Sequence, residues 1–241
     1  MTSSIIKTFV WSRKIRLFHW INVLAIFLLI MIGSAIYFDD ALGLSKDGKI
    51  LLKTLHVLTG YIFALNLLIR IIVGFIGTGY ERWSQTLPFT SAFKQELAQL
   101  KQNKNTVFTG RSPIGKLMIA VLFVFMTIQM ISGLVLAGTD IYYPPFGQHF
   151  AQSVALDKNN LAVIKPYSKE NIDAQAYKAM REFRSPFIYA HKKAFYILLL
   201  LIPLHIAAVI MLERKQKASI VSAMIHGYKY LPKKQDQDKN H

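Results

Sequence analysis

Four long runs of apolar residues, at positions 17–38, 54–79, 117–139 and 194–212, alternate with polar segments along the chain. Each run meets or exceeds the roughly 18 residues that a helix needs to span a bilayer. Arg70 is the one Asp, Glu, Lys or Arg residue inside them. We predict an all-α membrane protein, a four-transmembrane-helix bundle in a single domain over residues 1–241. The expected helices cover about 17–38, 54–79, 117–139 and 188–212.

The distribution of basic residues around these runs predicts the orientation of the chain in the membrane. Lys and Arg are concentrated before the first run, between the second and third, and after the fourth. In the first connecting segment, by contrast, three Asp residues offset the lysines. Because basic loops stay in the cytoplasm, we expect both termini and the second loop there. The long loop between the third and fourth helices, roughly 140–186, is then expected on the periplasmic side.

Two segments outside the four runs have features of their own. Residues 218–231 mix apolar side chains with Lys and His, which favours an interfacial helix at about these positions. The 140–186 loop is long for a connector, and loops of this length usually serve a function. It is either a cap that shields a cofactor edge from water or a docking surface for a periplasmic partner.

Composition excludes several kinds of chemistry. The 241 residues are 53% hydrophobic and include no cysteine, so the chain has no disulfide, no thiolate-bound iron–sulfur cluster and no covalently attached c-type heme. Any redox metal must therefore be held by histidine. The net charge of +16 raises the question of nucleic acid binding. The basic residues flank apolar runs, however, where topology and anionic lipid headgroups explain them, so we expect membrane lipid and no nucleic acid as a partner.

Four histidines, His19, His56, His191 and His205, lie inside or at the mouth of apolar runs. A titratable imidazole in hydrocarbon is costly and indicates a functional site. His191 and His205 are 14 positions apart on one predicted helix, which returns them to nearly the same face and separates them by roughly 21 Å. With the predicted orientation, His56 and His191 share an outer level of the membrane, and His19 and His205 share an inner one.

Paired imidazoles inside a helix bundle suit a six-coordinate b heme, because the porphyrin supplies the other four nitrogens. A zinc or copper site would need three or four converging protein ligands. The same spacing of 14 positions, which returns a residue to nearly the same helix face, relates His19 to Gly33 and His56 to Arg70. Gly33 would leave room for the outer porphyrin. Arg70 could neutralise a propionate of the inner porphyrin. The alternatives are that Arg70 reaches to the interface and that Gly33 only packs against another helix.

Several stretches of the chain resemble a known family. They are 16–20 (RLFHW), 55–60 (LHVLTG) with Arg70 downstream, the pair His191 and His205, 110–115 (GRSPIG) and 222–229 (SAMIHGYK). Over residues 10–230 the chain is similar to the prokaryotic cytochrome b-561 group, which includes the cytochrome b subunits of nickel-iron hydrogenases and formate dehydrogenases.

This resemblance implies two b hemes in a four-helix bundle of the bacterial inner membrane, carrying electrons between a periplasmic redox partner and the quinone pool. It makes His56 and His191 the ligands of the outer heme and His19 and His205 those of the inner heme. Arg111 and Ser112 are candidates for a quinone site near the inner heme. The partner is left open between a hydrogenase or dehydrogenase and a soluble c-type cytochrome.

Two other functions remain open at this point. The protein could be an enzyme in its own right that oxidises a small periplasmic substrate, such as superoxide, with quinone as the electron acceptor. It could also be a heme-free structural anchor whose histidines only pack.

Overall fold

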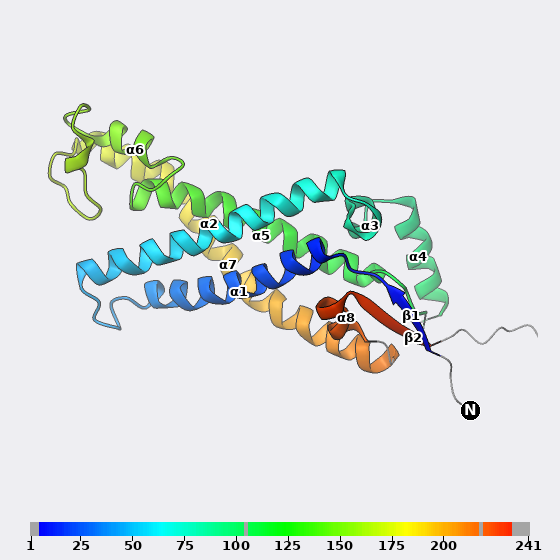
Figure 1. Ribbon diagram of the computed structural model, residues 1–241. Helices are drawn as coiled ribbons and strands as arrows, with labels where there is room; N and C mark the ends of the chain where they lie inside the picture. Colours follow the sequence, from blue (N-terminus) through cyan, green and yellow to red (C-terminus); the bar gives the residue numbers. More distant parts are fainter. Residues whose placement is uncertain (1–4, 104–105, 217–218, 233–241) are drawn as a thin grey trace, which may run out of the picture. The chain divides into compact units, whose positions relative to one another are not determined.

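Four long helices form the body of the protein in a computed structural model that describes residues 5–103, 106–216 and 219–232 (Figure 1). Within these described residues, four helices are long and apolar enough to cross a membrane. They are α1 (Arg13–Tyr37), α2 (Lys46–Ile76), α5 (Pro113–Asp140) and α7 (Ala174–Gln216). The four predicted apolar helices are therefore confirmed, and they support a multi-pass membrane protein.

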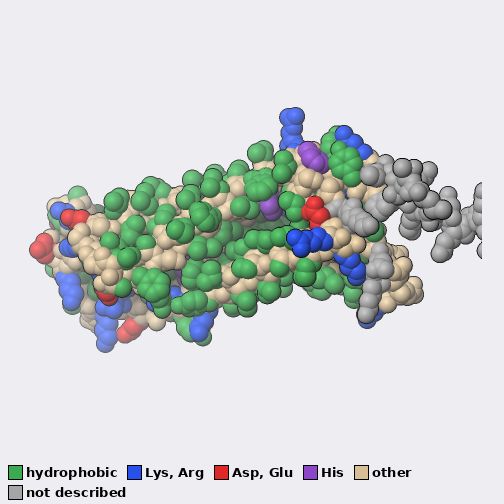
Figure 2. Space-filling model, turned by 90° about the horizontal axis from the view of Figure 1, so that it is seen from below, with side chains coloured by type: hydrophobic (Ala, Val, Ile, Leu, Met, Phe, Trp, Pro, Cys, Tyr) green, Lys and Arg blue, Asp and Glu red, His purple; other side chains and the backbone are tan. Residues whose placement is uncertain are grey.

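The apolar side chains of these helices face outwards. Only 6% to 28% of the residues in their most hydrophobic windows are buried inside the protein. Leu24, Phe27 and Phe75 are examples, each with 60% or more of its surface exposed. Hydrophobic side chains likewise cover much of the face shown in Figure 2. Surfaces of this kind are costly in water and stable in lipid.

All four helices begin before the residues that the hydrophobic pattern predicts, and polar residues cap the two with the largest differences, α2 and α7. The Ser45 hydroxyl accepts a hydrogen bond from the backbone N–H of Gly48 at 3.1 Å, so α2 starts at Lys46 and not near residue 54. The Asp173 carboxylate accepts one from the N–H of Ala176 at 2.7 Å, and α7 starts at Ala174 and not near residue 188. Caps of this type satisfy the free N–H groups of a first turn.

The secondary structure near the C-terminus differs from the interfacial helix expected at 218–231. Residues 228–232, expected to be the end of an interfacial helix, form strand β2 (Tyr228–Pro232), which pairs antiparallel with strand β1 (Ile5–Phe9). The preceding helix α8 (Ile220–His226) stops at Gly227, whose φ of 93° is a left-handed C-cap conformation. Ala218, the first residue of the expected helix, lies outside the described residues.

Shorter elements fill the connections. They are η1 (Gly79–Glu81), α3 (Trp83–Thr86), α4 (Ser91–Gln102), α6 (Gly147–Val154) and η2 (Leu161–Val163). The segment between α5 and α7 packs with the start of α7 in a small core, in which Val154 is fully buried and Ile164 and Met180 are largely buried. The long third loop is therefore a folded structure.

The internal contacts divide the chain into two compact units. Unit 1 comprises the described parts of Met1–Trp20, Ile69–Phe123 and Leu199–His241, and unit 2 comprises Ile21–Leu68 and Val124–Leu198. Each unit contains segments of α1, α2, α5 and α7. His19 and His205 belong to unit 1, whereas His56 and His191 belong to unit 2.

Candidate functional site

Unit 2 encloses a cavity of about 480 Å³ between its segments of α1, α2, α5 and α7. Most of its lining is apolar, with Ile30, Leu134 and Phe195 among the lining residues. His56 and His191 line it as well. A mostly apolar cavity of this size is typical of cofactor sites in helix bundles.

The two imidazoles are spaced for one metal ion. The ring centres of His56 and His191 are 6.3 Å apart. A metal–imidazole bond is about 2 Å long, so rings that bind one ion from opposite sides have centres about 6 Å apart. Among the described residues, no group of three or more His, Asp or Glu side chains converges as a site for a bare ion would require. The pair therefore fits an ion whose other ligands come from a porphyrin.

Glycines stand beside both rings. A Cβ atom added at Gly33 would lie 3.1 Å from Cε1 of His56, and one added at Gly133 would lie 3.4 Å from Cε1 of His191. Both glycines line the cavity, as does Gly60, one turn after His56. A side chain at Gly33 would therefore crowd the imidazole. The absence of a side chain at these positions leaves room for the rings and for a flat group next to them.

The hydrogen bonding of Ser132 determines which nitrogen of His191 is free. The Ser132 hydroxyl lies 2.6 Å from the Ile128 carbonyl, to which it donates, and 2.9 Å from Nδ1 of His191. A serine hydroxyl has a single proton, and the carbonyl takes it, so the Ser132 oxygen accepts the Nδ1 proton of His191. This leaves the Nε2 lone pair of His191 free for a metal.

His19 and His205 come together in unit 1. The two imidazoles are close enough to interact electrostatically. The Nδ1 atom of His19 is buried and has no hydrogen-bond partner among the described residues. Trp20 packs edge-on against the His19 ring at 5.2 Å, and its indole N–H donates to the Met224 carbonyl at 2.9 Å. The structure thus brings together the pair expected for the inner level.

Arg70 is buried in unit 1, with only 3% of its surface exposed. Its Nη2 atom donates to the Thr86 hydroxyl at 3.3 Å, and its guanidinium stacks over Trp83 at 4.4 Å. Its Nη1 atom has no hydrogen-bond partner among the described residues. The guanidinium also lies 6.0 Å from the ring of Phe18, the neighbour of His19 in sequence. A buried guanidinium whose Nη1 atom has no partner among the described residues is suited to bind an anion.

Arg111 and Ser112 have structural partners in unit 1. Arg111 donates to the Tyr80 carbonyl at 3.0 Å and stacks over Trp11 at 4.5 Å. Burial, and next the positive charge of Arg70, lowers the pKa of Arg111 to about 9. The Ser112 hydroxyl accepts from the N–H of Gly115 at 3.2 Å, so it caps the start of α5.

Ser132 and Lys53 are not among the site residues that the sequence predicts. The signal for Ser132 was a polar residue in the middle of an apolar run, directly before a glycine. Lys53 lines the cavity three residues before His56, where its position just outside the apolar run made it look like a flanking surface charge. Their roles depend on contacts with other helices, and helical spacing does not give those contacts.

Comparison with known proteins identifies the family of the chain. Residues 10–227 match the family described as prokaryotic cytochrome b561, and the chain belongs to that family. It is 23% identical over 240 residues to the probable Ni/Fe-hydrogenase B-type cytochrome subunit of Cupriavidus necator, an alignment that covers 94% of this chain and 88% of that protein. No solved structure matches the chain. Membership of a b-type cytochrome family implies heme b and membrane electron transfer.

Proposed function

We propose that this prokaryotic cytochrome b561 is a diheme electron carrier of the bacterial inner membrane that connects a periplasmic redox protein with the quinone pool. The spacing of His56 and His191 within one apolar cavity is the observation that carries the proposal. Bound heme would supply a one-electron Fe³⁺/Fe²⁺ couple. His56 and His191 would be the axial ligands of one heme, and His19 and His205 those of the other.

Several residues around the His56–His191 cavity favour the binding of a heme there. The largely apolar lining would lower the local dielectric constant around a bound cofactor. Gly33 and Gly133 leave space beside the imidazoles. Ser132 holds His191 with Nε2 available, so the ligand is oriented before the cofactor binds.

The spacing of the histidines supports a path for electrons across the membrane. Fourteen residues of helix separate His191 from His205, a rise of roughly 21 Å in a bilayer core about 30 Å thick. The distribution of Lys and Arg supports cytoplasmic termini, so the His56–His191 heme would lie toward the periplasm and the His19–His205 heme toward the cytoplasm. Electrons would then enter and leave at opposite faces.

The two ends of this path would have different partners. On the cytoplasmic side, Arg111 and the hydroxyl group of Ser112 are hydrogen-bond donors suited to a quinone oxygen. Arg70 is suited to bind a propionate of the nearby heme. On the periplasmic side, the folded segment between α5 and α7 is the candidate surface for a redox protein. The name of the Cupriavidus relative supports a hydrogenase as one partner of this class.

Heme counting tests the proposal. We expect two b hemes per chain in a pyridine hemochrome assay of the purified protein. His191→Ala should remove one heme and His205→Ala the other, because the two sites share α7 but no ligand. His149→Ala, which changes an exposed histidine outside both pairs, should retain two. A wild-type content of one heme per chain, or loss of both hemes in either variant with helix content unchanged, contradicts the paired arrangement.

A further inference from the structure

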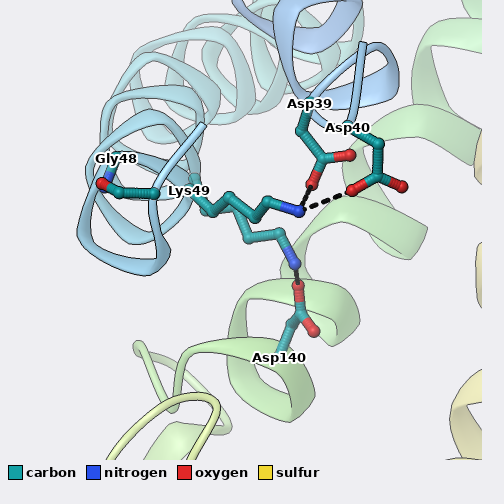
Figure 3. A network of polar contacts seen from close by, with 7 residues as sticks. Asp39, Asp40, Gly48, Lys49 and Asp140 are labelled. Atoms are coloured by element: carbon teal, nitrogen blue, oxygen red, sulfur yellow. Dashed lines mark hydrogen bonds and ion pairs between the residues drawn. The ribbon is translucent and has the colours of Figure 1, made fainter. Parts of the chain in front are cut away.

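Three charged side chains form a network at one edge of the His56–His191 cavity. Lys53 and Asp140 both line the cavity and form an ion pair with each other. Arg184 binds the same carboxylate at 2.7 Å. The Lys53 and Arg184 side chains are only 20% and 15% exposed, so both charges are largely removed from solvent. Figure 3 labels Asp140 and draws, without a label, the lysine side chain that contacts its carboxylate.

Lys53 and Asp140 lie on the same helix faces as residues that surround the imidazoles. Lys53 is three residues before His56 and shares its helix face, about 4.5 Å nearer the start of α2. Asp140 is seven residues, or two turns, after Gly133, again on one face. The network therefore lies at the edge of the cavity, on the side where α2 begins and α5 ends.

The charges of the network do not balance. One carboxylate, Asp140, faces two cations, Lys53 and Arg184. Asp39, which also lines the cavity, already binds Lys49 at 2.9 Å (Figure 3). Lys192 also lines the cavity, but it is exposed and adds nothing to the buried charge. Partly buried cations in excess of carboxylates are costly, and an anion bound in the cavity would offset that cost.

We propose that Lys53 binds a propionate carboxylate of the heme held by His56 and His191, with Asp140 and Arg184 as positioning residues for Lys53. The inference rests on the proposed function, because the ligand is the heme itself. Heme carries two carboxylates on one edge of an otherwise apolar macrocycle, and the network gives the cavity one cationic edge. A charge-assisted hydrogen bond at that edge fixes how the ring is turned about the axis through the two imidazoles.

Heme analogues without carboxylates test the proposal directly. Apo-protein from heme-deficient cells is titrated with protoheme and with its dimethyl ester, in the wild type, in Lys53→Met and in Lys49→Met. Lys49 is the matched control, because it lies one turn away, is 24% exposed and pairs with Asp39 and Asp40. At the His56–His191 site we expect the wild type and Lys49→Met to prefer protoheme about tenfold or more, and Lys53→Met to lose most of that preference.

Redox titration of the same variants gives a second measurement. Lys53→Met removes a positive charge and should shift the midpoint potential of the His56–His191 heme to more negative values, because the reduced form is then less favoured. Asp140→Asn removes a negative charge, retains Lys53 and should shift it to more positive values. The potential of the other heme should not change in either variant, and it serves as an internal check of folding.

Each outcome is informative. Equal binding of protoheme and its ester by the wild type, or an unchanged preference in folded Lys53→Met, overturns the propionate contact. If Lys53→Met does not fold, a potential of Asp140→Asn equal to that of the wild type overturns it instead. Failure of wild-type protein to bind any heme at this site would refute the proposed function, which is a different result from binding without discrimination.

Discussion

The two imidazoles of the unit 2 cavity have different surroundings. His191 donates its Nδ1 proton to Ser132, which is itself 2% exposed, whereas Nδ1 of His56 is buried without a hydrogen-bond partner among the described residues. When the ring nitrogen that does not bind the metal donates a hydrogen bond, the imidazole becomes a stronger electron donor to the metal. In the proposed heme site, His191 would therefore be the more basic and better-oriented ligand of the pair, because Ser132 accepts its Nδ1 proton.

Replacement of Ser132 should be visible in the redox potential. In Ser132→Ala, a weaker His191 ligand stabilises Fe³⁺ less, so we expect the midpoint potential of this heme to rise. The shift is about 59 mV for each tenfold change in the ratio of Fe³⁺ to Fe²⁺ affinity. Ser132→Thr retains a hydroxyl that can bond to a carbonyl in the preceding turn, and it should restore the wild-type value. An Ala variant with an unchanged potential would show that the contact is only a packing contact.

The small elements at the chain ends brace the helix segment that carries His19. The Arg16 side chain contacts the Ile225 carbonyl and Trp20 contacts the Met224 carbonyl, both at the end of α8. Strand β2 then returns the chain alongside β1, as Figure 1 shows. On β2, Lys229 is 5% exposed and donates to the carbonyls of Phe108 and Gly110, so it ties the strand to the segment before α5.

The burial of Lys229 predicts a pH dependence of stability. Burial, and next the positive charge of Arg111, lowers the pKa of Lys229 from 10.5 to about 8. Between these values the unfolded state binds more protons than the folded state, so this lysine makes the free energy of unfolding increase with pH. In detergent, we expect the wild type to gain stability relative to Lys229→Met between pH 8 and 10, by at most about 1.4 kcal/mol per pH unit.

The comparison needs a matched lysine. Lys7→Met removes an exposed lysine from the neighbouring strand β1 and controls for the loss of one positive charge. Thermal unfolding curves of the three proteins at several pH values provide the measurement. A difference between the wild type and Lys229→Met that does not change with pH would show that Lys229 titrates with its ordinary pKa.

At the scale of the whole molecule, the four long helices contribute segments to two compact units, and each unit contains one histidine pair. The same helices therefore carry two histidine pairs that share no residue. In the proposed function, each pair would have its own neighbouring residues to adjust the heme that it holds, Ser132 and Lys53 in unit 2 and Arg70 in unit 1. The orientation of the chain in the membrane therefore determines which histidine pair lies toward the periplasm and which toward the cytoplasm.

The absence of cysteine from the sequence makes that orientation measurable. Asn159→Cys and Gln102→Cys each place one thiol at an exposed position, in the segment between α5 and α7 and at the end of α4 respectively. With cytoplasmic termini, we expect a membrane-impermeant maleimide to label Asn159→Cys on intact spheroplasts and Gln102→Cys only after permeabilisation. The reverse pattern would invert the topology and place the His56–His191 site toward the cytoplasm.

The hydrophobic pattern predicted the four membrane helices, because a run of apolar residues long enough to cross a bilayer has few stable alternatives to a helix. It could not predict where α2 and α7 begin, since their first turns are polar and are stabilised by Ser45 and Asp173. It also predicted a helix for residues 228–231, where the structure has β2. A short strand forms only next to a partner, and that partner is β1, more than 200 residues away.

The sequence by itself also determined the chemistry available to the candidate site. Histidine is the one strong ligand for a redox metal in a chain without cysteine, and the regular spacing of helical residues was enough to group four histidines into two levels. The tertiary structure decided what each ligand contacts. Ser132 lies beside His191, and Lys53 beside Asp140, through contacts between different helices. Such contacts depend on how helices are rotated and packed, and the periodicity of one helix contains no information about its neighbour.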